Sequence, residues 1–328
     1  MIGGAGYIGS VLAGRLLDGG YCVRVLDALL YDNAAAVSRL TTRAGFTFQR
    51  GDFCCESDLN QSMEGITDVV HLAALVGDPV CKKFPDIAKH INENGTFELI
   101  DRLDQFDIQR FIFMSTCSNY GLQPDDTPAT EDTALNPQSL YAETKVKVEQ
   151  RLLGSKGDFD YSVTVLRAAT AYGLSPRMRF DLTVNEFTRE LALGSELLVY
   201  DADTWRPYCH VDDICTAIRL VLESDRARVN GQVFNVGCDE ENYTKRMIVD
   251  LICNLLPKVE IRYQTGSVDP RNYRVAFQRI RTVLGFQANH TVAEFASELI
   301  EVIRQGRFHQ DIDHGSFRRN ITPTYPSH

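Results

Sequence analysis

The sequence predicts an α/β protein built on a doubly wound parallel sheet. Short apolar runs alternate with helical patterns through the first half of the chain, and a glycine-rich loop opens the sequence. The runs lack polar alternation, which is typical of strands covered on both faces by helices. This alternation favours parallel pairing, because parallel strands need a long crossover connection between them.

The elements can be justified in chain order. After the glycine loop a helix is expected, because Val11, Leu12, Leu16 and Leu17 share one helical face. Five apolar runs then read as strands, and a sixth should return to the main sheet late in the chain: residues 21–28, 46–53, 68–75, 110–118, 161–169 and 232–237. Ligands of such sheets bind beyond the carboxyl ends of the strands. The residues at these ends that we expect to face a ligand are Asp27, Asp52, Ala73, Ala74 and Thr116.

Composition excludes several classes of protein. The 328 residues suffice for one large domain or two ordinary ones. The net charge of −10 disfavours nucleic-acid and anionic-membrane surfaces. No apolar run approaches the roughly 20 residues that span a bilayer. Nine scattered cysteines without a CxxC pair indicate free thiols and a cytoplasmic protein. The histidines show no ligand spacing, so no metal site is expected.

The opening loop has the spacing of a dinucleotide-binding turn. Its glycines fit Gly3-x-x-Gly6-x-x-Gly9 and, overlapping it, Gly4-x-Gly6-x-x-Gly9. Glycines permit a tight turn and the close approach of a pyrophosphate, whose charge the following helix N-terminus stabilises. Asp27, at the end of the next strand, would accept hydrogen bonds from both ribose hydroxyls and repel a 2′-phosphate. The predicted cofactor is therefore NAD rather than NADP, on a Rossmann-type sheet.

One feature departs from this pattern. A dinucleotide loop should follow a strand at the centre of the sheet, yet only Met1 and Ile2 precede the loop. Without that strand the core would be exposed. We therefore expect that this sequence is clipped at its N-terminus, or that earlier residues are not represented in it.

The chemistry is expected at Tyr141-x-x-x-Lys145. Residues 136–153 begin as a turn and continue as a helix, on which these two side chains share a face. Tyrosine is a weak base because its reference pKa is about 10, but a nearby lysine cation favours the phenolate. Such a pair can take the proton from a sugar hydroxyl, and Thr116 at a neighbouring strand tip could hold the same oxygen. The alternative is a surface helix that carries this spacing by chance.

Seven segments, taken together and in order, resemble the extended short-chain dehydrogenase/reductase family in its NAD-dependent epimerase/dehydratase branch: GGAGYIGS, HLAAL, STCSNYG, LYAETK, VLRAATAYG, RPYCHVDD and FNVG. Members oxidise a hydroxyl of a nucleotide-activated sugar, often at C4, with bound NAD. The resemblance implies that the catalytic residues are Thr116, Tyr141 and Lys145. The implied NAD contacts, which also include this tyrosine and lysine, are Gly3, Gly6, Tyr7, Ile8, Gly9, Asp27, Asp52, Phe53, Leu72, Ala73, Ala74 and Asn92.

The resemblance also implies a nucleotide-diphosphate sugar as the substrate. Arg206 matches the family's diphosphate arginine, and a guanidinium suits a diphosphate through bidentate hydrogen bonds. Thr170 stands where many members carry an asparagine that contacts the diphosphate. The candidate substrate contacts are Cys117, Ser118, Thr170, Arg179, Asn185, Arg206, Arg271 and Arg274, with one of the last two expected to reach a phosphate.

Cys117 and Ser118 stand where the family's 4,6-dehydratases carry Asp and Glu. Dehydration needs an acid and a base, which a thiol and a hydroxyl replace poorly. Dehydration is therefore not expected. Two roles remain open for Cys117, a proton donor or a small buried thiol facing the substrate cavity.

The resemblance implies two domains and a homodimer. Residues 1–173 and 207–237 would form the NAD-binding Rossmann domain, and residues 174–206 and 238–328 a smaller, discontinuous α/β domain for the nucleotide sugar. The tail from Gln305 is polar and is expected to be a loosely ordered end or lid. Helices near residues 87–104 and 138–153 would make the dimer contact.

Three functions follow from this sequence. The leading one is an NAD-dependent nucleotide-sugar epimerase that acts through a transient 4-keto sugar. The alternative is a 4-dehydrogenase that releases the keto sugar. The segments VGDPVC, SPRMRFDL and NYTKR are similar to those of GDP-heptose 4-dehydrogenase-like enzymes. The third, a noncatalytic NAD-binding module, would usually have lost the tyrosine or the lysine.

Overall fold

A six-stranded parallel sheet forms the centre of the chain. The structure, a computed structural model, describes residues 1–328 except 124–126, 155–158, 257, 267–270 and 309–328. Two strands pair at one side of the sheet and four at the other, all in parallel. In spatial order they are β2 (Phe46–Arg50), β1 (Val23–Asp27), β3 (Asp68–His71), β4 (Arg110–Thr116), β5 (Ser162–Ala168) and β9 (Gln232–Val236). The predicted doubly wound sheet, including its late strand, is confirmed.

Ile2 joins the two groups of strands. It forms parallel bridges to Leu26 in β1 and to His71 in β3, and its amide donates to the carbonyl of Val70 at 3.0 Å. Its side chain is only 2% exposed. The residues before the glycine loop therefore stand at the central position of the sheet, and the loop leaves from its carboxyl edge.

One layer of helices packs against one face of the sheet. Helix α1 (Tyr7–Asp18), helix α9 (Val211–Glu223) and helix α12 (Gln278–Leu284) share one apolar cluster with strand residues such as Val25 and Ile112. Period-two alternation of the strands sends these side chains to this face. The predicted amphipathic helix after the glycine loop is thus α1.

A second layer of helices covers the opposite face. Helix α3 (Glu56–Met63), helix α6 (Thr96–Leu103) and helix α7 (Leu140–Gly154) pack in another apolar cluster with Phe111 and Val165. These strand residues alternate with those of the first face, so the sheet is buried on both sides. Helix α7 begins at Leu140, as expected for a segment that starts as a turn at residue 136 and continues as a helix.

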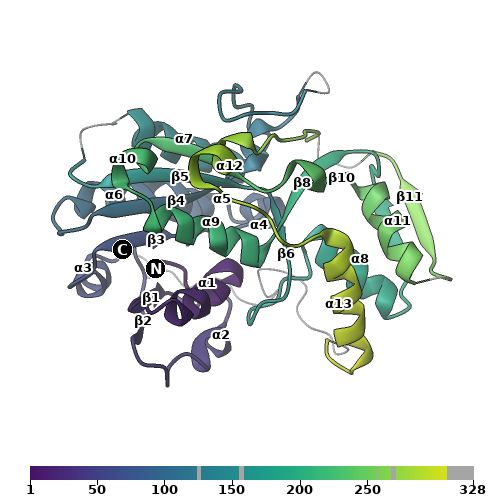
Figure 1. Cartoon of the computed structure of the whole chain (residues 1–328), viewed down its shortest axis with the longest axis horizontal. Helices are drawn as coiled ribbons and strands as arrows, with labels where there is room; N and C mark the ends of the chain where they lie inside the picture. The colour runs from purple at the N-terminus through teal and green to yellow at the C-terminus, as the bar shows by residue number, and fades with distance from the viewer. Residues whose placement is uncertain (124–126, 155–158, 257, 267–270, 309–328) are drawn as a thin grey trace.

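A third apolar cluster forms the core of a smaller part of the molecule, which lies at the right of Figure 1 and is called the second half below. It contains α8 (Thr183–Ala192), α11 (Lys245–Leu255), α13 (Val292–Arg304) and the parallel pair β7 (Leu197–Tyr200) and β11 (Ile261–Gln264). A small sheet of β6 (Thr170–Tyr172), β8 (Trp205–His210) and β10 (Asn242–Thr244) lies beside it. The short remaining helices are α2 (Ala35–Ser38), α4 (Asp78–Lys83), α5 (Pro85–Lys89), the π-helix η1 (His90–Gly95), the 3₁₀ turn η2 (Cys117–Tyr120), α10 (Arg226–Val229) and the 3₁₀ turn η3 (Asp239–Glu241). The domain limits given above remain a prediction.

The strand expected at residues 68–75 is shorter in the structure, where β3 ends at His71. The amides of Leu72 and Ala73 both donate to the carbonyl of Ile2, so the chain turns away from the ladder there. The following residues form a loop over the carboxyl edge. This early turn places the loop where a ligand of the sheet would lie.

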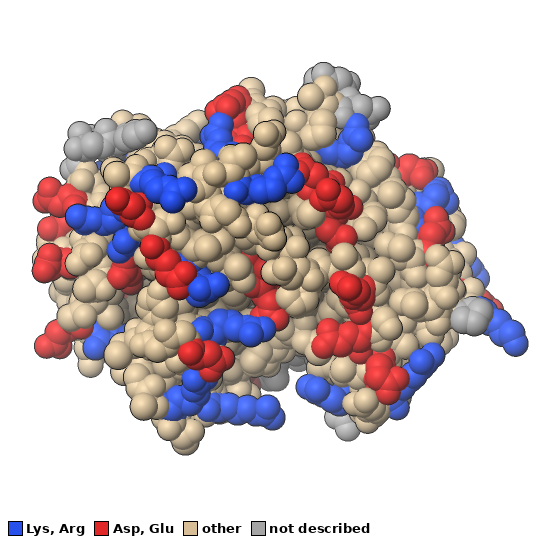
Figure 2. Space-filling view, viewed as in Figure 1, with Lys and Arg blue, Asp and Glu red and all other residues tan. Residues whose placement is uncertain are grey.

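The surface adds two observations. Among the described residues, no helix combines the length and the apolar character needed to cross a bilayer. In Figure 2, lysines and arginines are interspersed with acidic residues over the face in view.

A buried ion pair connects helix α7 to the sheet. Arg167 in β5 donates to Oε1 of Glu149 in α7 at 3.2 Å and to Oε2 at 3.0 and 2.6 Å, and the two side chains are 5% and 1% exposed. Asn119 in η2 donates to the same carboxylate at 2.8 Å, and Ser115 at the end of β4 donates to it as well. One carboxylate therefore fixes the helix, two strands and the turn.

Replacing Glu149 with leucine should lower the free energy of unfolding by about 3–5 kcal/mol, because Arg167 is left buried without its counter-charge. Urea unfolding measures the change. The matched control is Glu223→Ala, which breaks the exposed pair with Arg219 and should cost less than about 1 kcal/mol. Equal losses in the two variants would contradict the role given to the buried pair.

Candidate active site

A cavity of about 470 Å³ lies at the carboxyl edge of the central sheet, between the sheet and the second half of the molecule. The ends of β1, β3, β4 and β5 all contribute to its wall. This is the edge at which the sequence predicted a ligand. The predicted site residues that line the cavity are Gly3, Gly6, Tyr7, Ile8, Gly9, Asp27, Asp52, Phe53, Leu72, Ala73, Ala74, Thr116, Ser118, Tyr141, Lys145, Thr170, Arg179, Arg206 and Arg271.

The glycine loop leaves no room for side chains. Gly3 has a φ of +81°, and a Cβ there would lie 2.5 Å from the amide nitrogen of Ala73. A Cβ on Gly9 would lie 2.5 Å from the carbonyl oxygen of Gly3. Helix α1 starts inside the cavity wall, and its N-cap Gly6 provides no side-chain cap. Open amides at a helix N-terminus suit a phosphate, so this loop fits a dinucleotide.

Asp27 is held rigidly beside this loop. Its carboxylate accepts hydrogen bonds from the amides of Ala5, at 2.9 Å, and Leu29, at 2.8 Å. Burial raises the pKa of the Asp27 carboxyl, and the two amides oppose that shift. A carboxylate offers about four lone-pair sites, so acceptor capacity remains for the ribose hydroxyls of a dinucleotide.

The three expected catalytic residues meet in the cavity. Tyr141 and Lys145 lie one turn apart on α7, and Thr116 ends β4. The ammonium of Lys145 donates to the carbonyl of Met114 at 2.9 Å and lies 5.8 Å from the centre of the Tyr141 ring. The hydroxyl of Thr116 accepts from the amide of Ser118 at 3.1 Å. A hydroxyl, a phenol and an amine thus converge on one space.

The protonation states differ from the expectation that Lys145 favours the phenolate. Burial raises the pKa of Tyr141 above its ordinary value, and the nearby Cys81 and Asp78 raise it further. Burial also lowers the pKa of Lys145 to about 7, although the carboxylate of Glu149 opposes that shift. Without a ligand, the phenol of Tyr141 therefore keeps its proton at neutral pH.

Cys117 does not face the cavity, so that expectation is wrong. Its side chain is 1% exposed, and its thiol donates to the carbonyl of Arg167 at 3.1 Å. Burial raises the pKa of this thiol. The chain turns at η2, so Thr116 and Ser118 line the cavity while Cys117 packs in the core.

Two asparagines expected to contact ligands bond other parts of the chain instead. Asn92 is 1% exposed and bonds both the amide and the carbonyl of Leu75, at 2.7 and 2.9 Å. Asn185 accepts from the amide of Gly173 and donates to the hydroxyl of Tyr7. Neither asparagine is among the described residues that line the cavity. Both positions hold neighbouring loops in place.

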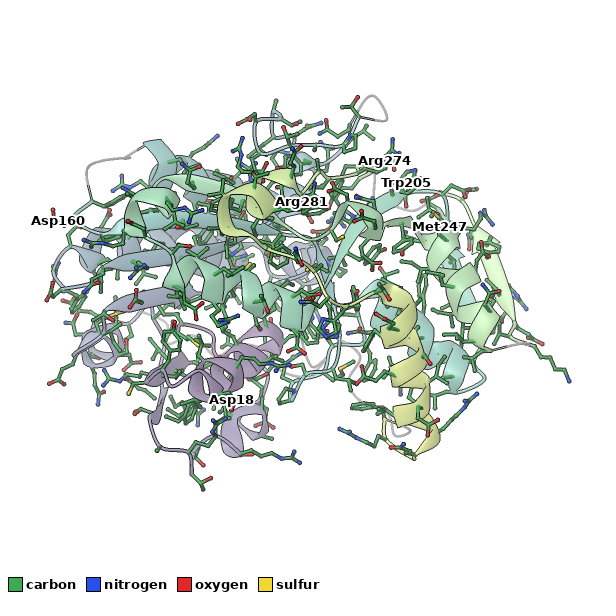
Figure 3. All side chains as sticks on the ribbon, in the orientation of Figure 1. Asp18, Asp160, Trp205, Met247, Arg274 and Arg281 are labelled. Atoms are coloured by element: carbon green, nitrogen blue, oxygen red, sulfur yellow. The ribbon has the colours of Figure 1, made fainter. Side chains whose placement is uncertain are left out.

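The three arginines of the second half take different positions. Arg206 lines the cavity and donates to the carbonyls of Trp205 and Arg271, at 2.7 and 2.5 Å. Arg271 lines it too and pairs with Asp78 at 2.8 Å. Arg274 instead lies over the indole of Trp205, 5.1 Å from the ring centre, and these two residues are labelled side by side in Figure 3. Of the pair offered by the sequence, Arg271 is the one that reaches the cavity.

Some lining residues were not singled out from the sequence. Asp78 lies in the segment VGDPVC, and Arg177 lies in SPRMRFDL with its guanidinium 4.9 Å from the centre of the Tyr31 ring. Both segments are among those compared above with GDP-heptose 4-dehydrogenase-like enzymes. The charged residues of these segments could have pointed to the site from sequence, because charged side chains are seldom buried without a partner or a ligand.

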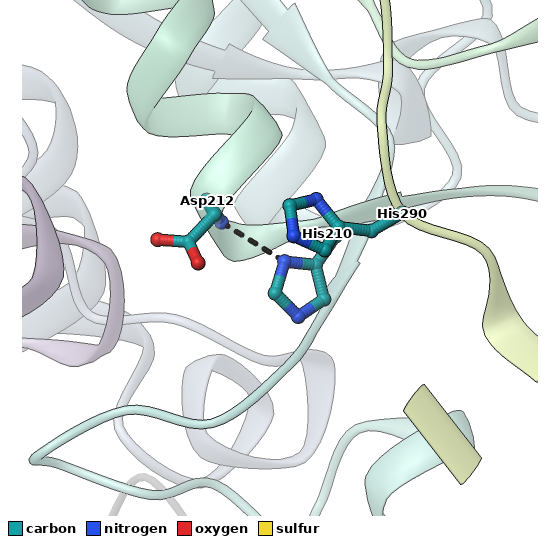
Figure 4. Close-up of side chains that lie close together, drawn as sticks. All are labelled: His210, Asp212 and His290. Atoms are coloured by element: carbon teal, nitrogen blue, oxygen red, sulfur yellow. Dashed lines mark hydrogen bonds between the residues drawn. The ribbon is translucent and has the colours of Figure 1, made fainter. Parts of the chain in front are cut away.

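The structure brings together His210, Asp212 and His290, which the sequence spacing did not suggest (Figure 4). The Nδ1 atom of His210 accepts from the amide of Asp212 at 3.2 Å and caps α9. The carboxylate of Asp212 pairs with Arg15 at 2.8 Å, and the ring of His290 bonds Asp213. These groups thus already serve a helix cap and ion pairs.

Comparison with known proteins places this chain among sugar-nucleotide enzymes. The model of the NAD dependent epimerase/dehydratase family matches residues 1–237. A UDP-glucose 4-epimerase of Corynebacterium glutamicum is 28% identical over 317 residues, which cover 88% of this chain and 90% of that protein. A dTDP-glucose 4,6-dehydratase of Streptomyces griseus is 31% identical over 303 residues, covering 87% of each chain.

Solved structures have the same fold. UDP-glucuronic acid 4-epimerase from Bacillus cereus, in complex with UDP-glucuronic acid and NAD, superposes with a TM-score of 0.84 at 23% identity, covering 93% of this chain and 98% of that one. DesIV, a dTDP-glucose 4,6-dehydratase from Streptomyces venezuelae with NAD bound, gives a TM-score of 0.82 at 26% identity, covering 93% and 96%. The predicted sheet with an added C-terminal domain is the fold of these enzymes.

The lowered pKa of Lys145 predicts a pH-dependent stability. The pKa of Lys145 is about 7 in the folded chain, and its ordinary value is 10.5. Between these two pH values the lysine is protonated in the unfolded chain but not in the folded one. Stability contributed at this site therefore rises with pH in that window. Relative to Lys145→Met, the wild type should gain about 1 kcal/mol per pH unit from pH 7 to 9.

Urea unfolding of the ligand-free proteins at pH 6, 7, 8 and 9 measures this gain. The control is Lys147→Met, because the side chain of Lys147 is half exposed, and its difference from wild type should not change with pH. A constant difference for Lys145→Met would show that the lysine is not desolvated in the folded chain.

Proposed function

The chain belongs to the NAD-dependent epimerase/dehydratase family, and we propose that it is a nucleotide-sugar 4-epimerase that acts through a transient 4-keto sugar. The observation that carries this proposal is the convergence of Thr116, Tyr141 and Lys145 in one cavity with the glycine loop and Asp27. A dinucleotide site and a proton-transfer group thus lie in the same cavity, where a bound sugar could contact both the dinucleotide and that group.

NAD fits the first part of this cavity. The glycine loop and the start of α1 would hold the pyrophosphate, and Asp27 the ribose. Asp52, Phe53, Leu72, Ala73 and Ala74 line the same part of the wall. When bound, NAD supplies the hydride acceptor and a positive ring that favours the phenolate of Tyr141.

The residues of this chain would handle the proton and the orientation of the sugar. Tyr141 takes the proton of the C4 hydroxyl, and Thr116 holds the same oxygen by a hydrogen bond. Lys145, protonated below a pH of about 7 in the ligand-free chain, would stabilise the phenolate when it forms. Arg206 would bind the diphosphate, with Thr170 and Arg179 lining the route to the nucleotide.

Epimerisation is preferred over dehydration because of the residues at the tip of β4. The thiol of Cys117 is in the core, and Ser118 offers only a hydroxyl to the cavity. Neither supplies the acid and base that removal of water requires. The second candidate is a 4-dehydrogenase, on a heptose or a hexose, which would use the same three residues. The presence of Tyr141 and Lys145 in the cavity argues against a noncatalytic module.

A panel of nucleotide hexoses and heptoses incubated with the NAD-loaded protein tests this function by mass spectrometry after chromatographic separation. Epimerisation gives an unchanged mass at a new retention time. Loss of two hydrogens would establish the dehydrogenase instead, and loss of water would establish a dehydratase. Absence of any product across the panel would contradict the proposed enzyme.

Tyr141→Phe should reduce turnover of the substrate found in this panel by about 10²–10⁴-fold, because the proton acceptor is lost. NAD binding, measured by calorimetry, should stay within a few fold of wild type. Tyr21→Phe is the matched control: this tyrosine donates to Glu223 and is not among the described residues that line the cavity, so turnover of the variant should be unchanged. Wild-type turnover in Tyr141→Phe would remove the tyrosine from the mechanism.

We also propose that the protein is a homodimer, with the helices near residues 87–104 and 138–153, which include α6 and α7, at the contact. These helices lie side by side in one chain, where Arg151 in α7 pairs with Asp101 in α6. Light scattering at micromolar concentration should report a particle of twice the 36.8 kDa chain. A monomer would reject this assembly.

A further inference from the structure

A charged pair stands in the cavity wall beside the proposed catalytic residues. Asp78 is in the first turn of α4, and its carboxylate accepts from Arg271 at 2.8 Å. Arg271 also donates to the hydroxyl of Ser118 at 3.3 Å. The two charged side chains are 20% and 18% exposed, and all three residues line the cavity. They come from three segments of the chain that meet only in the folded protein.

The position of this pair identifies the part of a ligand that it would contact. The amide of Ser118 donates to the hydroxyl of Thr116 at 3.1 Å. Ser118 therefore contacts both Arg271 and the proposed catalytic hydroxyl. The charge of Asp78 also contributes to the raised pKa of Tyr141, after burial and Cys81. Asp78 and Arg271 therefore lie at the reacting sugar rather than at the dinucleotide loop.

One oxygen of Asp78 lacks a hydrogen-bond donor. Oδ2 is paired with Arg271, whereas Oδ1 is buried and has no partner among the described residues. A buried carboxylate oxygen without a donor is costly, and such groups are few in folded proteins. A sugar hydroxyl in the cavity could donate to it. A sugar carboxylate could not, because an ionised carboxylate has no proton to donate.

We propose that Asp78 and Arg271 select neutral nucleotide hexoses over the corresponding nucleotide uronates, with Oδ1 of Asp78 accepting a hydrogen bond from a sugar hydroxyl. This selection rests on the proposed function. Since the charge of Arg271 is matched by Asp78, a uronate carboxylate would gain no counter-charge there and would meet the carboxylate of Asp78. Specificity would thus come from a repulsive group as well as an attractive one.

A second pair in the cavity fits the same arrangement. Arg179 donates to both carboxylate oxygens of Asp181, at 3.1 and 2.6 Å, and both residues line the cavity. This guanidinium, too, has an acidic partner already. Buried like-charge contacts cost several kcal/mol, so a further carboxylate in this cavity would be disfavoured.

The test compares kcat/KM for two sugars with the same base, the hexose that reacts in the panel and its C6 carboxylate counterpart. The wild type should prefer the hexose at least tenfold. Asp78→Asn removes the negative charge and releases Arg271, so it should reduce that preference at least tenfold. Asp78→Ala also removes the acceptor and should raise KM for the hexose about tenfold.

The matched control is Asp68→Asn. Asp68 pairs with Arg110 at 3.1 Å in a partly buried contact at the amino end of β3, outside the cavity lining. The preference of this variant for the hexose over the uronate should stay within twofold of that of the wild type. Melting temperatures of all variants show whether each one folds.

A wild type that prefers the uronate, or an Asp78→Asn variant with unchanged preference, would overturn the selection while the proposed function stands. If no sugar in the panel reacts, the proposed function fails by itself. Calorimetric dissociation constants for UDP-glucose and UDP-glucuronic acid, with the same variants, then decide the selection. Equal affinities, or no binding of either sugar, would overturn it.

Discussion

The buried ion pair between Glu149 and Arg167 is the interaction on which the active-site geometry depends. It connects α7 to β5, and Ser115 and Asn119 bind the same carboxylate from β4 and the turn that follows. Lys145 lies one helical turn before Glu149, and Thr116 directly follows Ser115. Any shift of this carboxylate would move the helix that carries the phenol relative to the strand that carries the hydroxyl. Such a network is costly to bury, and Oδ1 of Asn119 has no partner among the described residues, but the ion pair and the other hydrogen bonds favour one arrangement.

The same network explains the alternation at the tip of β4. The side chain of Ser115 bonds Glu149 and that of Cys117 bonds the carbonyl of Arg167, whereas the hydroxyls of Thr116 and Ser118 are left for the proposed site. A strand directs successive side chains to opposite faces, and the 3₁₀ turn continues that alternation for two more residues, Cys117 and Ser118. Structural and chemical groups can therefore be neighbours in sequence without competing for the same space.

Charge is distributed unevenly around the cavity. Near the proposed catalytic phenol the arginines have acidic partners, as in the pairs of Arg271 with Asp78 and Arg179 with Asp181. The groups that would transfer a proton are desolvated instead, which raises the pKa of Tyr141 and lowers that of Lys145 to about 7. An incoming positive charge would act strongly on both groups, because few waters screen it there.

The sequence by itself determined the sheet, the glycine loop with Asp27, and the pairing of Tyr141 with Lys145, because each depends on short spacings that local backbone geometry converts directly into position. Asp52 and Thr116 were predictable for a similar reason, since strand ends share one edge of a parallel sheet. Sequence could not decide which way Cys117, Asn92, Asn185 and Arg274 point, and it did not single out Asp78. Those outcomes depend on contacts between distant segments, such as Asp78 with Arg271 or Asn185 with Tyr7. Only packing of the complete chain brings these groups together, because a side chain's burial and partners are set by the neighbours that folding supplies.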